Sequence, residues 1–337
     1  MPSQRDVARA AGLSVATVSM ALRDSPLIHR ETREAVFAAA RRIGYEANPY
    51  VGQFMSAMRK KQGKSFKGNL ALLWFDEYPE AEQNPDLFRI RKGAIERAEE
   101  LGYNLAEFRL VEHKPRALEK ILRSRGIRGV VVTPSIAAPK KTRLRLPIEG
   151  LACVALGSAI WNPVLHSIRL DHFQTMQLAL HHARHRFGKG IAALWKSKSD
   201  RRADHLIYGS FLAHHPGGPA LATRLFLDWQ QVKAKPAETL RLFRQHGIEA
   251  FVAESDDISS DWLRKAVPER NVVYRNEAQP SRCYGYIDSQ FGLMGKWGID
   301  FLASLLQSHE YGPPSQPKTV LIPPRWIPGA GSAFQSG

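Results

Sequence analysis

The stretch SVATVSMALR, residues 14–23, decides how the N-terminal part of the chain folds. Ser14 is a favourable N-cap residue, because its hydroxyl can accept a hydrogen bond from a backbone N–H of the first helical turn. Helical spacing divides the remaining side chains between an inward face of Val18, Ala21 and Leu22 and an outward face of Ala16, Ser19, Met20 and Arg23. We therefore expect a short helix with one face packed inward and the other free.

The flanking segments predict a helix on each side of this stretch. Upstream, Ser3-Gln4-Arg5-Asp6 resembles a capping box with Asp in place of Glu, and the alanine-rich helix 6–11 ends at Gly12. Two short helices joined by a tight turn form the helix-turn-helix arrangement, whose second helix enters the major groove. Downstream, residues 31–43 read as a third helix that ends at Gly44. An ordinary helix pair in an all-α subdomain is the alternative interpretation.

Residues 48–58 predict a further short helix with an apolar stripe. Asn48 is an N-cap, Pro49 takes the first helical position, and Val51, Phe54, Met55 and Met58 share one face. Such a helix is too short to be stable alone, so we expect it to require a partner. Residues 59–68 then form a basic, glycine-containing linker, for which a solvated tether is an equally good description.

Residues 5–58 resemble the headpiece and hinge helix of LacI-family transcription repressors. The resemblance rests on Asp6-Val7-Ala8, Ala11-Gly12-Leu13-Ser14, Ala16-Thr17-Val18-Ser19, Thr32-Arg33-Glu34, Gly44-Tyr45 and Asn48. It implies that Val15, Ala16 and Met20 read bases, and that paired hinge helices insert a wedge into the minor groove, where Phe54 replaces the family's Leu. The expected DNA-binding residues are Ser14, Val15, Ala16, Thr17, Ser19, Met20, Arg23, Asn48 and Phe54.

Composition fits a nucleic-acid partner. The 337 residues carry a net charge of +16, and residues 1–67 hold twelve Lys or Arg against five Asp or Glu. A basic head suits phosphate contacts, which supply affinity without sequence information. Since the chain contains no long apolar run and no apolar N-terminal signal region, we expect a cytoplasmic protein without a membrane span. Cys153 and Cys283 lack metal-ligand spacing and read as buried thiols.

After residue 68, strand and helix patterns alternate. Strands are expected at 69–75, 103–108, 129–133, 151–156, 190–195, 225–227, 250–253 and 271–274, and helices at 87–101, 117–125, 175–187, 205–214, 237–246, 258–266 and 292–306. This alternation predicts parallel sheets covered by helices, with ligands outside the carboxyl ends of the strands.

The second half extends the resemblance to the two-lobed, periplasmic-binding-protein-like body of the LacI family. Its cues are Ile127 to Val132, Arg169-Leu170-Asp171, Gly188-Lys189-Gly190-Ile191 and Gly295 to Asp300. We predict a headpiece at 1–47, a hinge helix at 48–58, a linker at 59–68 and an effector-binding and dimerisation body at 69–331. Within the body, lobe 1 would hold about 69–168 plus 289–318, and lobe 2 about 169–288 plus 319–331.

The resemblance places a small-molecule effector in the cleft between the lobes. Candidate ligand-binding residues are Asp76, Thr133, Trp161, Asp171, Trp195, Asp256 and Asn276, with Ser135 and Trp74 near the same strand ends. Core or edge packing explains each Trp better than a sugar platform does, and helix capping explains the acids equally well. Leu206 stands three residues before Gly209 where many relatives carry Arg, so the family's sugar clamp is missing. The alternatives are that Arg201, Arg202 or His205 takes its place, that the effector is of another kind, or that the cleft has lost small-molecule control.

The sequence offers no recognisable catalytic site, and we expect no cofactor. It contains neither a Walker A motif nor a G-x-G-x-x-G helix opening, and His181 and His185 lack the Glu of the zinc-protease motif. We expect a sequence-specific regulator, most simply a repressor, that binds a pseudo-palindromic operator as a homodimer under control of a small molecule such as a sugar. The alternatives are a DNA-binding head fused to a sugar-metabolising enzyme such as a kinase, and a sugar-binding transport component.

Overall fold

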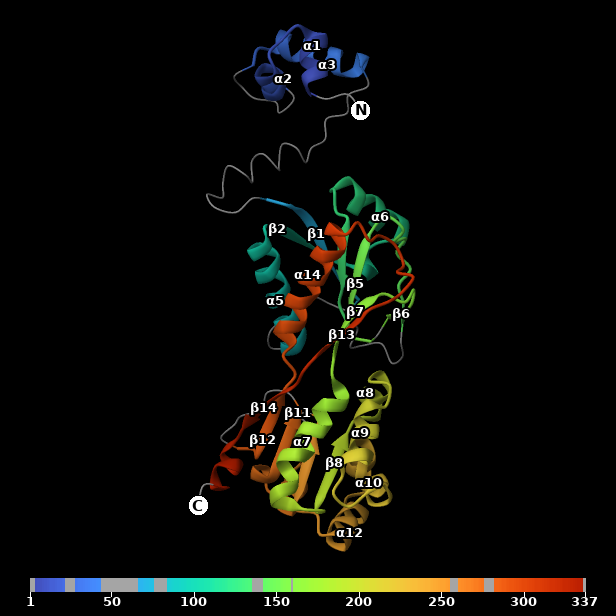
Figure 1. Ribbon diagram of the computed structural model, residues 1–337, viewed down its shortest axis with the longest axis vertical. Coiled ribbons are helices and arrows are strands. Elements are labelled where there is room, and N and C mark those ends of the chain that lie inside the picture. Colours follow the sequence, from blue (N-terminus) through green and yellow to red (C-terminus); the bar gives the residue numbers. More distant parts are fainter. Residues whose placement is uncertain are drawn as a thin grey trace. The chain divides into compact units, whose positions relative to one another are not determined.

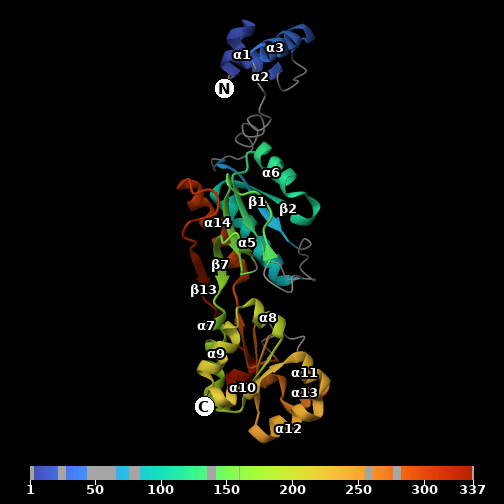
Figure 2. The ribbon, with the colours of Figure 1, turned by 90° about the vertical axis from the view of Figure 1, so that its right-hand side faces the viewer.

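The computed structural model describes residues 4–21, 28–43, 66–75, 84–134, 142–158, 160–254, 260–275 and 282–335. The chain folds into two compact units, residues 1–68 and residues 69–337. Both units are drawn in Figures 1 and 2. Among the helices described, none has the length and apolar character that crossing a lipid bilayer requires.

The N-terminal unit contains three helices, α1 (Gln4–Ala11), α2 (Val15–Ala21) and α3 (Arg30–Arg42). Their bounds lie within two residues of those expected, and the turn between α1 and α2 has Gly12 at φ +65°, a backbone conformation that suits glycine. The core consists of small and β-branched side chains that let the helices approach closely: Val7, Ala8, Val18, Ala21, Val36, Ala39 and Ala40. The inward face predicted for α2 is therefore confirmed at Val18 and Ala21, while Leu22 lies outside the described residues.

The first lobe of the larger unit is built on a six-stranded sheet in the order β13-β7-β5-β3-β1-β2. Its strands are β1 (Gly68–Trp74), β2 (Tyr103–Arg109), β3 (Gly129–Val132), β5 (Ala152–Leu156), β7 (His166–Leu170) and β13 (Thr319–Ile322). Every pairing recorded within it is parallel. A separate two-stranded ladder joins β4 (Thr142–Arg143) to β6 (Ile160–Asn162).

Alternate residues of these strands supply the two faces of the first lobe. Leu70, Leu72 and Trp74 pack against α5 (Pro85–Leu101) and α14 (Phe291–Gln307) on one face. Ala71 and Leu73 pack against α6 (Pro115–Ser124) on the other. The continuous apolar run of β1 is thus that of a strand buried on both sides, as parallel sheets require. Gly102 ends α5 in the left-handed conformation, as predicted.

The second lobe is built on a sheet of six strands in the order β14-β12-β11-β10-β8-β9, in which only β14 is antiparallel among the recorded pairings. Its strands are β8 (Ile191–Trp195), β9 (Phe226–Asp228), β10 (Ala250–Ala253), β11 (Val272–Arg275), β12 (Gly285–Asp288) and β14 (Arg325–Pro328). The helices around it are α7 (His172–Phe187), α8 (Ser197–Arg202), α9 (Leu206–His214), α10 (Pro219–Leu225), α11 (Trp229–Ala234), α12 (Pro236–His246) and α13 (Asp261–Ala266). Single-turn 3₁₀ segments occupy Leu110–Glu112 (η1) and Glu269–Asn271 (η2), and a longer one Ala330–Gln335 (η3).

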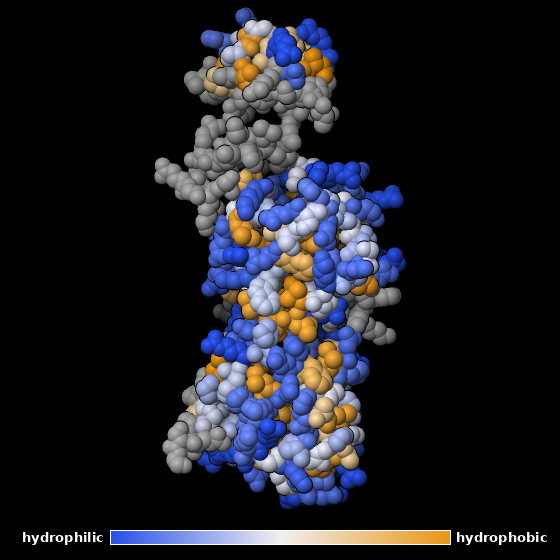
Figure 3. All heavy atoms as spheres, viewed as in Figure 1, coloured by the Kyte–Doolittle hydropathy of each residue, from blue (hydrophilic) through white to orange (hydrophobic). Residues whose placement is uncertain are grey.

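The space-filling view in Figure 3 shows hydrophilic side chains over most of the visible face of the body, with apolar ones in patches.

The chain passes between the lobes three times, and the division predicted for the last passage is wrong. Strand β13 pairs with β7 in the first sheet, so residues 319–322 belong to lobe 1 rather than lobe 2. The crossing lies at 323–324, between β13 and β14. Strand β7 likewise carries the first sheet to Leu170, so the first crossing falls at Asp171. The error arose because β13 is an exposed edge strand whose short Thr-Val-Leu-Ile run lacks an alternating pattern.

The three crossings are tied to one another by hydrogen bonds. The backbone N–H of Asp171 donates to the carbonyl oxygen of Ile322 over 3.1 Å. The side-chain amide of Gln290, in the crossing between β12 and α14, donates to the carbonyl of Pro323 over 2.7 Å. These bonds hold the connecting segments as one bundle between the two sheets. A change in the angle between the lobes must therefore be accommodated by all three segments together.

Candidate functional site

Helix α2 begins with the capping arrangement that its sequence predicts. The backbone N–H of Thr17 donates to the Ser14 hydroxyl over 3.0 Å, and the hydroxyls of Ser14 and Thr17 are 2.8 Å apart. The Val18 N–H donates to the Ser14 carbonyl over 3.0 Å, which starts the helical ladder. Ser14 thus satisfies a donor that the helix leaves unpaired. Thr17 has its hydroxyl engaged in this cap.

The outward side of α2 is exposed at its first turn. Val15 is 44% exposed. Met20 is half-buried on the same helix. The side chains of Ala16 and Ser19, and the whole of Arg23, Asn48 and Phe54, lie outside the described part of the chain. Of the expected DNA-binding set, the structure therefore brings Ser14, Val15, Thr17 and Met20 together on one short helix.

The other two helices of the head carry exposed arginines. Arg9 on α1 and Arg41 on α3 are exposed, while Arg42 donates to the Ala10 carbonyl over 2.7 Å and so joins α3 to the end of α1. Arg30 forms an exposed ion pair of 2.8 Å with Glu34. The unit combines an exposed apolar helix with accessible guanidinium groups. Guanidinium groups bind phosphate, and apolar side chains can contact thymine methyl groups.

In the larger unit, several predicted ligand-binding residues have structural partners. The Thr133 hydroxyl is fully buried and donates to the Leu73 carbonyl over 3.1 Å. The Asp171 carboxylate accepts from the Gln174 N–H over 2.8 Å and caps α7, which was the alternative left open for the acids. The indole of Trp74 is buried and donates to Glu107 over 2.9 Å. These three side chains stabilise the lobes instead of presenting free polar groups.

The remaining predicted residues divide into one that the structure locates and several that it does not describe. Trp195 ends β8 with 1% of its surface exposed, and its indole Nε1 has no hydrogen-bond partner among the described residues. Residues 76, 135, 256 and 276 and the side chain of Trp161 lie outside the described residues.

Arg275, which sequence reasoning missed, is the centre of a charged cluster at the strand ends. Its guanidinium carbon lies 5.7 Å from the centroid of the Trp195 ring. Burial, with a further contribution from the Arg275 charge, lowers the pKa of His172 to about 3, so this imidazole is neutral. In lobe 1, burial raises the pKa of Asp86 at the start of α5, and the positive charge of Arg275 opposes that rise. Arg275 therefore interacts with groups from both lobes.

The only sequence signal for this cluster was local and weak. Arg275 ends a buried strand beside Asn276, and His172 follows the capping Asp171. Nothing in the sequence spacing brings these residues to Trp195 or Asp86. A further contact between the lobes is the hydrogen bond from the Ser158 hydroxyl to the Arg202 carbonyl, 2.8 Å long. It closes lobe 1 onto the end of α8 near the same strand ends.

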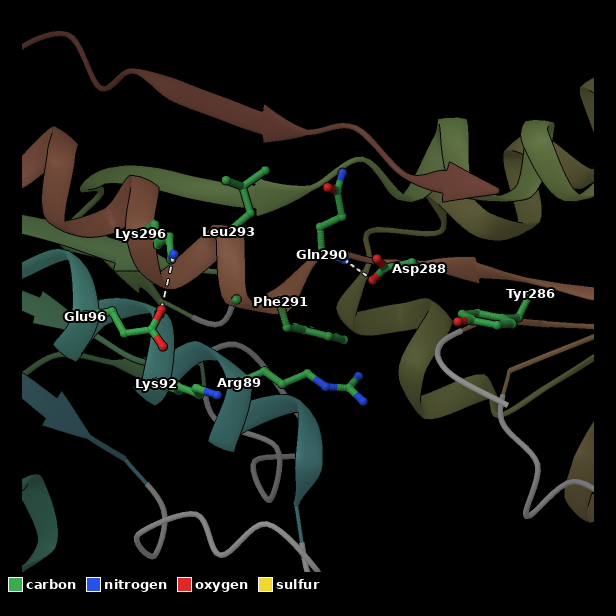
Figure 4. Close-up of a pocket in the computed structure, with 11 residues that line it drawn as sticks. Arg89, Lys92, Glu96, Tyr286, Asp288, Gln290, Phe291, Leu293 and Lys296 are labelled. Carbon is green, nitrogen blue, oxygen red and sulfur yellow. Dashed lines mark hydrogen bonds and ion pairs between the residues drawn. The ribbon is translucent and has the colours of Figure 1, made fainter. Parts of the chain in front are cut away.

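A pocket of about 550 Å³ lies where α5, β12 and the start of α14 meet. Figure 4 shows its lining: Arg89, Lys92 and Glu96 come from α5, Tyr286 and Asp288 from β12, and Gln290, Phe291, Leu293 and Lys296 from the crossing and α14. Lys296 pairs with Glu96 over 3.1 Å, and Asp288 accepts from the Gln290 N–H over 2.8 Å. Arg89 and Asp288 also act electrostatically on Asp86, so the pocket adjoins the Arg275 cluster.

The thiols and the histidine pair do not form a metal site. Cys153 and Cys283 are both buried and unpaired, and burial raises the pKa of the Cys283 thiol to about 11. The rings of His181 and His185 stand 5.6 Å apart between centroids, edge to face. Within the described ranges, no group of three or more His, Cys, Asp or Glu side chains is arranged to hold a metal ion.

Comparison with known proteins finds relatives for the head and for the whole chain. Residues 4–48 match the model of the family described as bacterial regulatory proteins, lacI family. Over 279 residues the chain is 25% identical to the HTH-type transcriptional regulator AscG of Escherichia coli (strain K12), covering 81% of this chain and 79% of that protein. Over 44 residues it is 54% identical to GalS, another HTH-type transcriptional regulator, of Salmonella typhimurium (strain LT2), covering 13% of each chain.

The fold also matches solved structures along its whole length. The lac repressor dimer bound to operator and the anti-inducer ONPF has a TM-score of 0.53 to this chain, with 18% sequence identity, covering 98% of this chain and 99% of the other. At this identity the likeness shows a shared fold. The predicted architecture, a helix-turn-helix headpiece followed by two parallel α/β sheets, is thereby confirmed.

Proposed function

The chain belongs to the lacI family of DNA-binding transcription regulators, with an effector-binding body behind its helix-turn-helix head, and from this premise we propose that it is a homodimeric repressor of a pseudo-palindromic operator. The similarity to the transcriptional regulator AscG extends over 81% of this chain and so includes the body, which favours a regulator over a kinase behind a DNA-binding head. Operator binding places its action in the cytoplasm, beside the chromosome.

The observation that carries this proposal is the exposed, Ser14-capped helix α2 on a basic three-helix head. One such head offers few base contacts, because its recognition helix α2 is only seven residues long and Val18 and Ala21 of that helix are buried. The affinity and specificity typical of operator-binding proteins therefore require two heads on one DNA site. Two heads related by two-fold symmetry bind two inverted half-sites, so the operator is pseudo-palindromic. The lac repressor with the same fold was solved as an operator-bound dimer, which supports the same assembly here.

The proposed control site is the inter-lobe cleft at the carboxyl ends of both sheets. Arg275, Trp195 and His172 from lobe 2 face Asp86 of lobe 1 there, and a ligand that contacted both lobes would favour one angle between them. Since the three crossings move together, a ligand-induced change in the angle between the lobes would also move the segments that lead to the head. The anti-inducer in the related lac repressor complex supports a small molecule as effector.

The test is a selection of bound DNA from a random pool by the full-length protein, repeated with a panel of sugars and other metabolites. We expect two inverted half-sites, a stoichiometry of two chains per site by mass photometry, and a change in DNA affinity with at least one metabolite. Enrichment of a single asymmetric half-site by one chain would contradict the dimer. A variant with Val15→Glu, which places negative charge on the open face of α2, should lose selection while the body remains folded.

A further inference from the structure

Three unpartnered polar atoms of the Arg275 cluster can all donate a hydrogen bond. Arg275 Nε, Trp195 Nε1 and His172 Nδ1 are all buried without a hydrogen-bond partner among the described residues. The arginine and indole nitrogens can only donate, and the neutral imidazole can donate from Nδ1 by its choice of tautomer. A buried donor left unpaired is destabilising, so native proteins rarely keep several in one place. Their convergence around Arg275 indicates an absent acceptor.

Three carboxylates lie near the cluster: Asp86 and Asp288 have partners of their own, and Asp204 acts electrostatically on His172. The Asp86 carboxylate lies 3.9 Å from the Arg89 guanidinium, and Asp288 accepts the Gln290 N–H. No ion pair within the described part of the chain joins Arg275 to a carboxylate. Among those residues, Arg275 has the Asp86 carboxylate as an electrostatic neighbour but no ion pair with it, and the cluster adds unpartnered donor atoms and an aromatic face beside the guanidinium. The hydroxyls of a neutral sugar can accept from these donors, whereas an anion would in addition complement the charge of Arg275.

We propose that the ligand of this cleft carries a carboxylate or phosphate group, which binds to Arg275 and accepts from the Trp195 indole N–H. This inference rests on the proposed function, because it names the chemical class of the effector for the same cleft. The guanidinium offers a fork of N–H donors matched to the planar carboxylate or to two phosphate oxygens. In its Nδ1–H tautomer, the neutral His172 ring adds a third donor without adding charge. The rest of the ligand would extend along the strand ends toward Asp86.

The experiment measures binding to the full-length protein by isothermal titration calorimetry. The probes are glucose, glucose 6-phosphate, gluconate and inorganic phosphate, so that the phosphate and carboxylate sources of the anion are separated from the sugar. We expect at least one anionic probe to bind and glucose to bind more weakly than its anionic counterpart. Saturable binding of glucose alone, or no binding of any anion at millimolar concentration, overturns the proposal.

Three variants test whether the anion binds in the cleft and not to basic residues elsewhere in the chain. Arg275→Gln should weaken the anion by about tenfold or more, since a charged hydrogen bond is lost. Arg241→Gln, on the exposed face of α12, is the matched control and should bind as the parent protein does. Trp195→Phe keeps an aromatic ring and removes the indole N–H donor, so it should weaken binding less than Arg275→Gln. Unchanged affinity in Arg275→Gln places the anion elsewhere and refutes the assignment.

The calorimetric result does not depend on DNA binding, so operator binding measured in parallel separates the two proposals. If the protein binds DNA but prefers glucose to the anions, the proposed function stands and the anionic ligand is refuted. If the protein binds the anion through Arg275 but selects no DNA, the anionic ligand stands and the proposed function is refuted.

Discussion

The Cβ position of Gly93 in α5 lies 2.1 Å from the carbonyl oxygen of Gly292 at the start of α14, so the backbones of these two helices touch. Gly295 repeats the contact one turn on, because its Cβ position is 2.1 Å from the Ile90 carbonyl. Helix α14 directly follows the second crossing between the lobes, and α5 lines the same pocket. The helix pair therefore fixes the place where lobe 2 joins lobe 1.

Gly93→Ala should destabilise the body, because the added methyl would overlap backbone atoms that cannot rotate away. Overpacking of this kind costs about 1 to 3 kcal/mol, and the short contact to a carbonyl places this site at the upper end. The measurement is urea-induced unfolding of the full chain followed by circular dichroism. Gly209→Ala is the matched control, since Gly209 lies in α9 with nothing within 4 Å of its Cβ position, and alanine there should be neutral or stabilising. Equal midpoints for the two variants would contradict the close crossing.

Local patterns in the sequence predicted most of the elements, and the remainder depended on contacts between distant segments. The helix stop at Gly102 and the cap at Ser14 are decided within a few residues, so both were read from the sequence. Strand β13 is exposed, and only its pairing with β7 assigns it to the first sheet, which explains the misplaced lobe boundary. The Arg275 cluster draws on four separate segments. No single-sequence pattern brings Asp86, His172 and Trp195 to one arginine.

Ser14→Ala should weaken α2, because the Thr17 N–H loses its acceptor. Loss of an N-cap costs about 1 kcal/mol, a large share of the stability of a three-helix head. We expect faster amide hydrogen exchange at Thr17 and lower affinity for the selected operator. Ser14→Asn retains a capping oxygen and should restore both. If the Asn variant were as defective as the Ala variant, Ser14 would act through its own contact with DNA and not through the cap.

Met20→Arg should change the half-site sequence that the protein prefers. Met20 lies on the open side of α2 and is apolar, as is the exposed Val15, so we expect readout of thymine methyl groups and of DNA shape. An arginine at this position can bind the O6 and N7 acceptors of guanine, and the selected sequence should shift toward guanine there. Met20→Leu, which stays apolar, should retain the original profile. An unchanged profile for the arginine variant would show that Met20 does not face the bases.

His172 should make the body less stable as the pH falls. Its pKa is about 3 in the folded chain, against about 6.5 in the unfolded chain, because burial penalises the charged imidazole. Between these values the unfolded state binds the proton and the folded state does not, so stability is lost as pH falls from 6.5 toward 3. The loss amounts to at most about 1.4 kcal/mol per pH unit from this residue.

The difference in unfolding free energy between the parent protein and His172→Gln, measured from pH 7.5 to 4.5, isolates the contribution of His172. We expect the parent protein to lose stability relative to the variant below pH 6.5. A parallel nuclear magnetic resonance titration should give no imidazole transition for His172 near pH 6.5. A midpoint at the ordinary value would show that the ring is solvated.

Phe54→Ala should remove the bend in operator DNA while leaving the phosphate contacts of the head. Phe54 lies outside the described residues, and the prediction rests on the short apolar hinge segment 48–58, which requires a partner helix to fold. An aromatic wedge between base steps offsets the cost of unstacking through the contacts that bent DNA allows. We therefore expect an affinity loss of about 1 to 3 kcal/mol and a smaller bend by fluorescence energy transfer. The salt dependence should be nearly unchanged, because no phosphate contact is lost.

Phe54→Leu keeps an apolar wedge and should bend DNA almost as the parent does. Normal affinity with a normal bend in Phe54→Ala would show that Phe54 packs inward within the hinge instead of entering the minor groove.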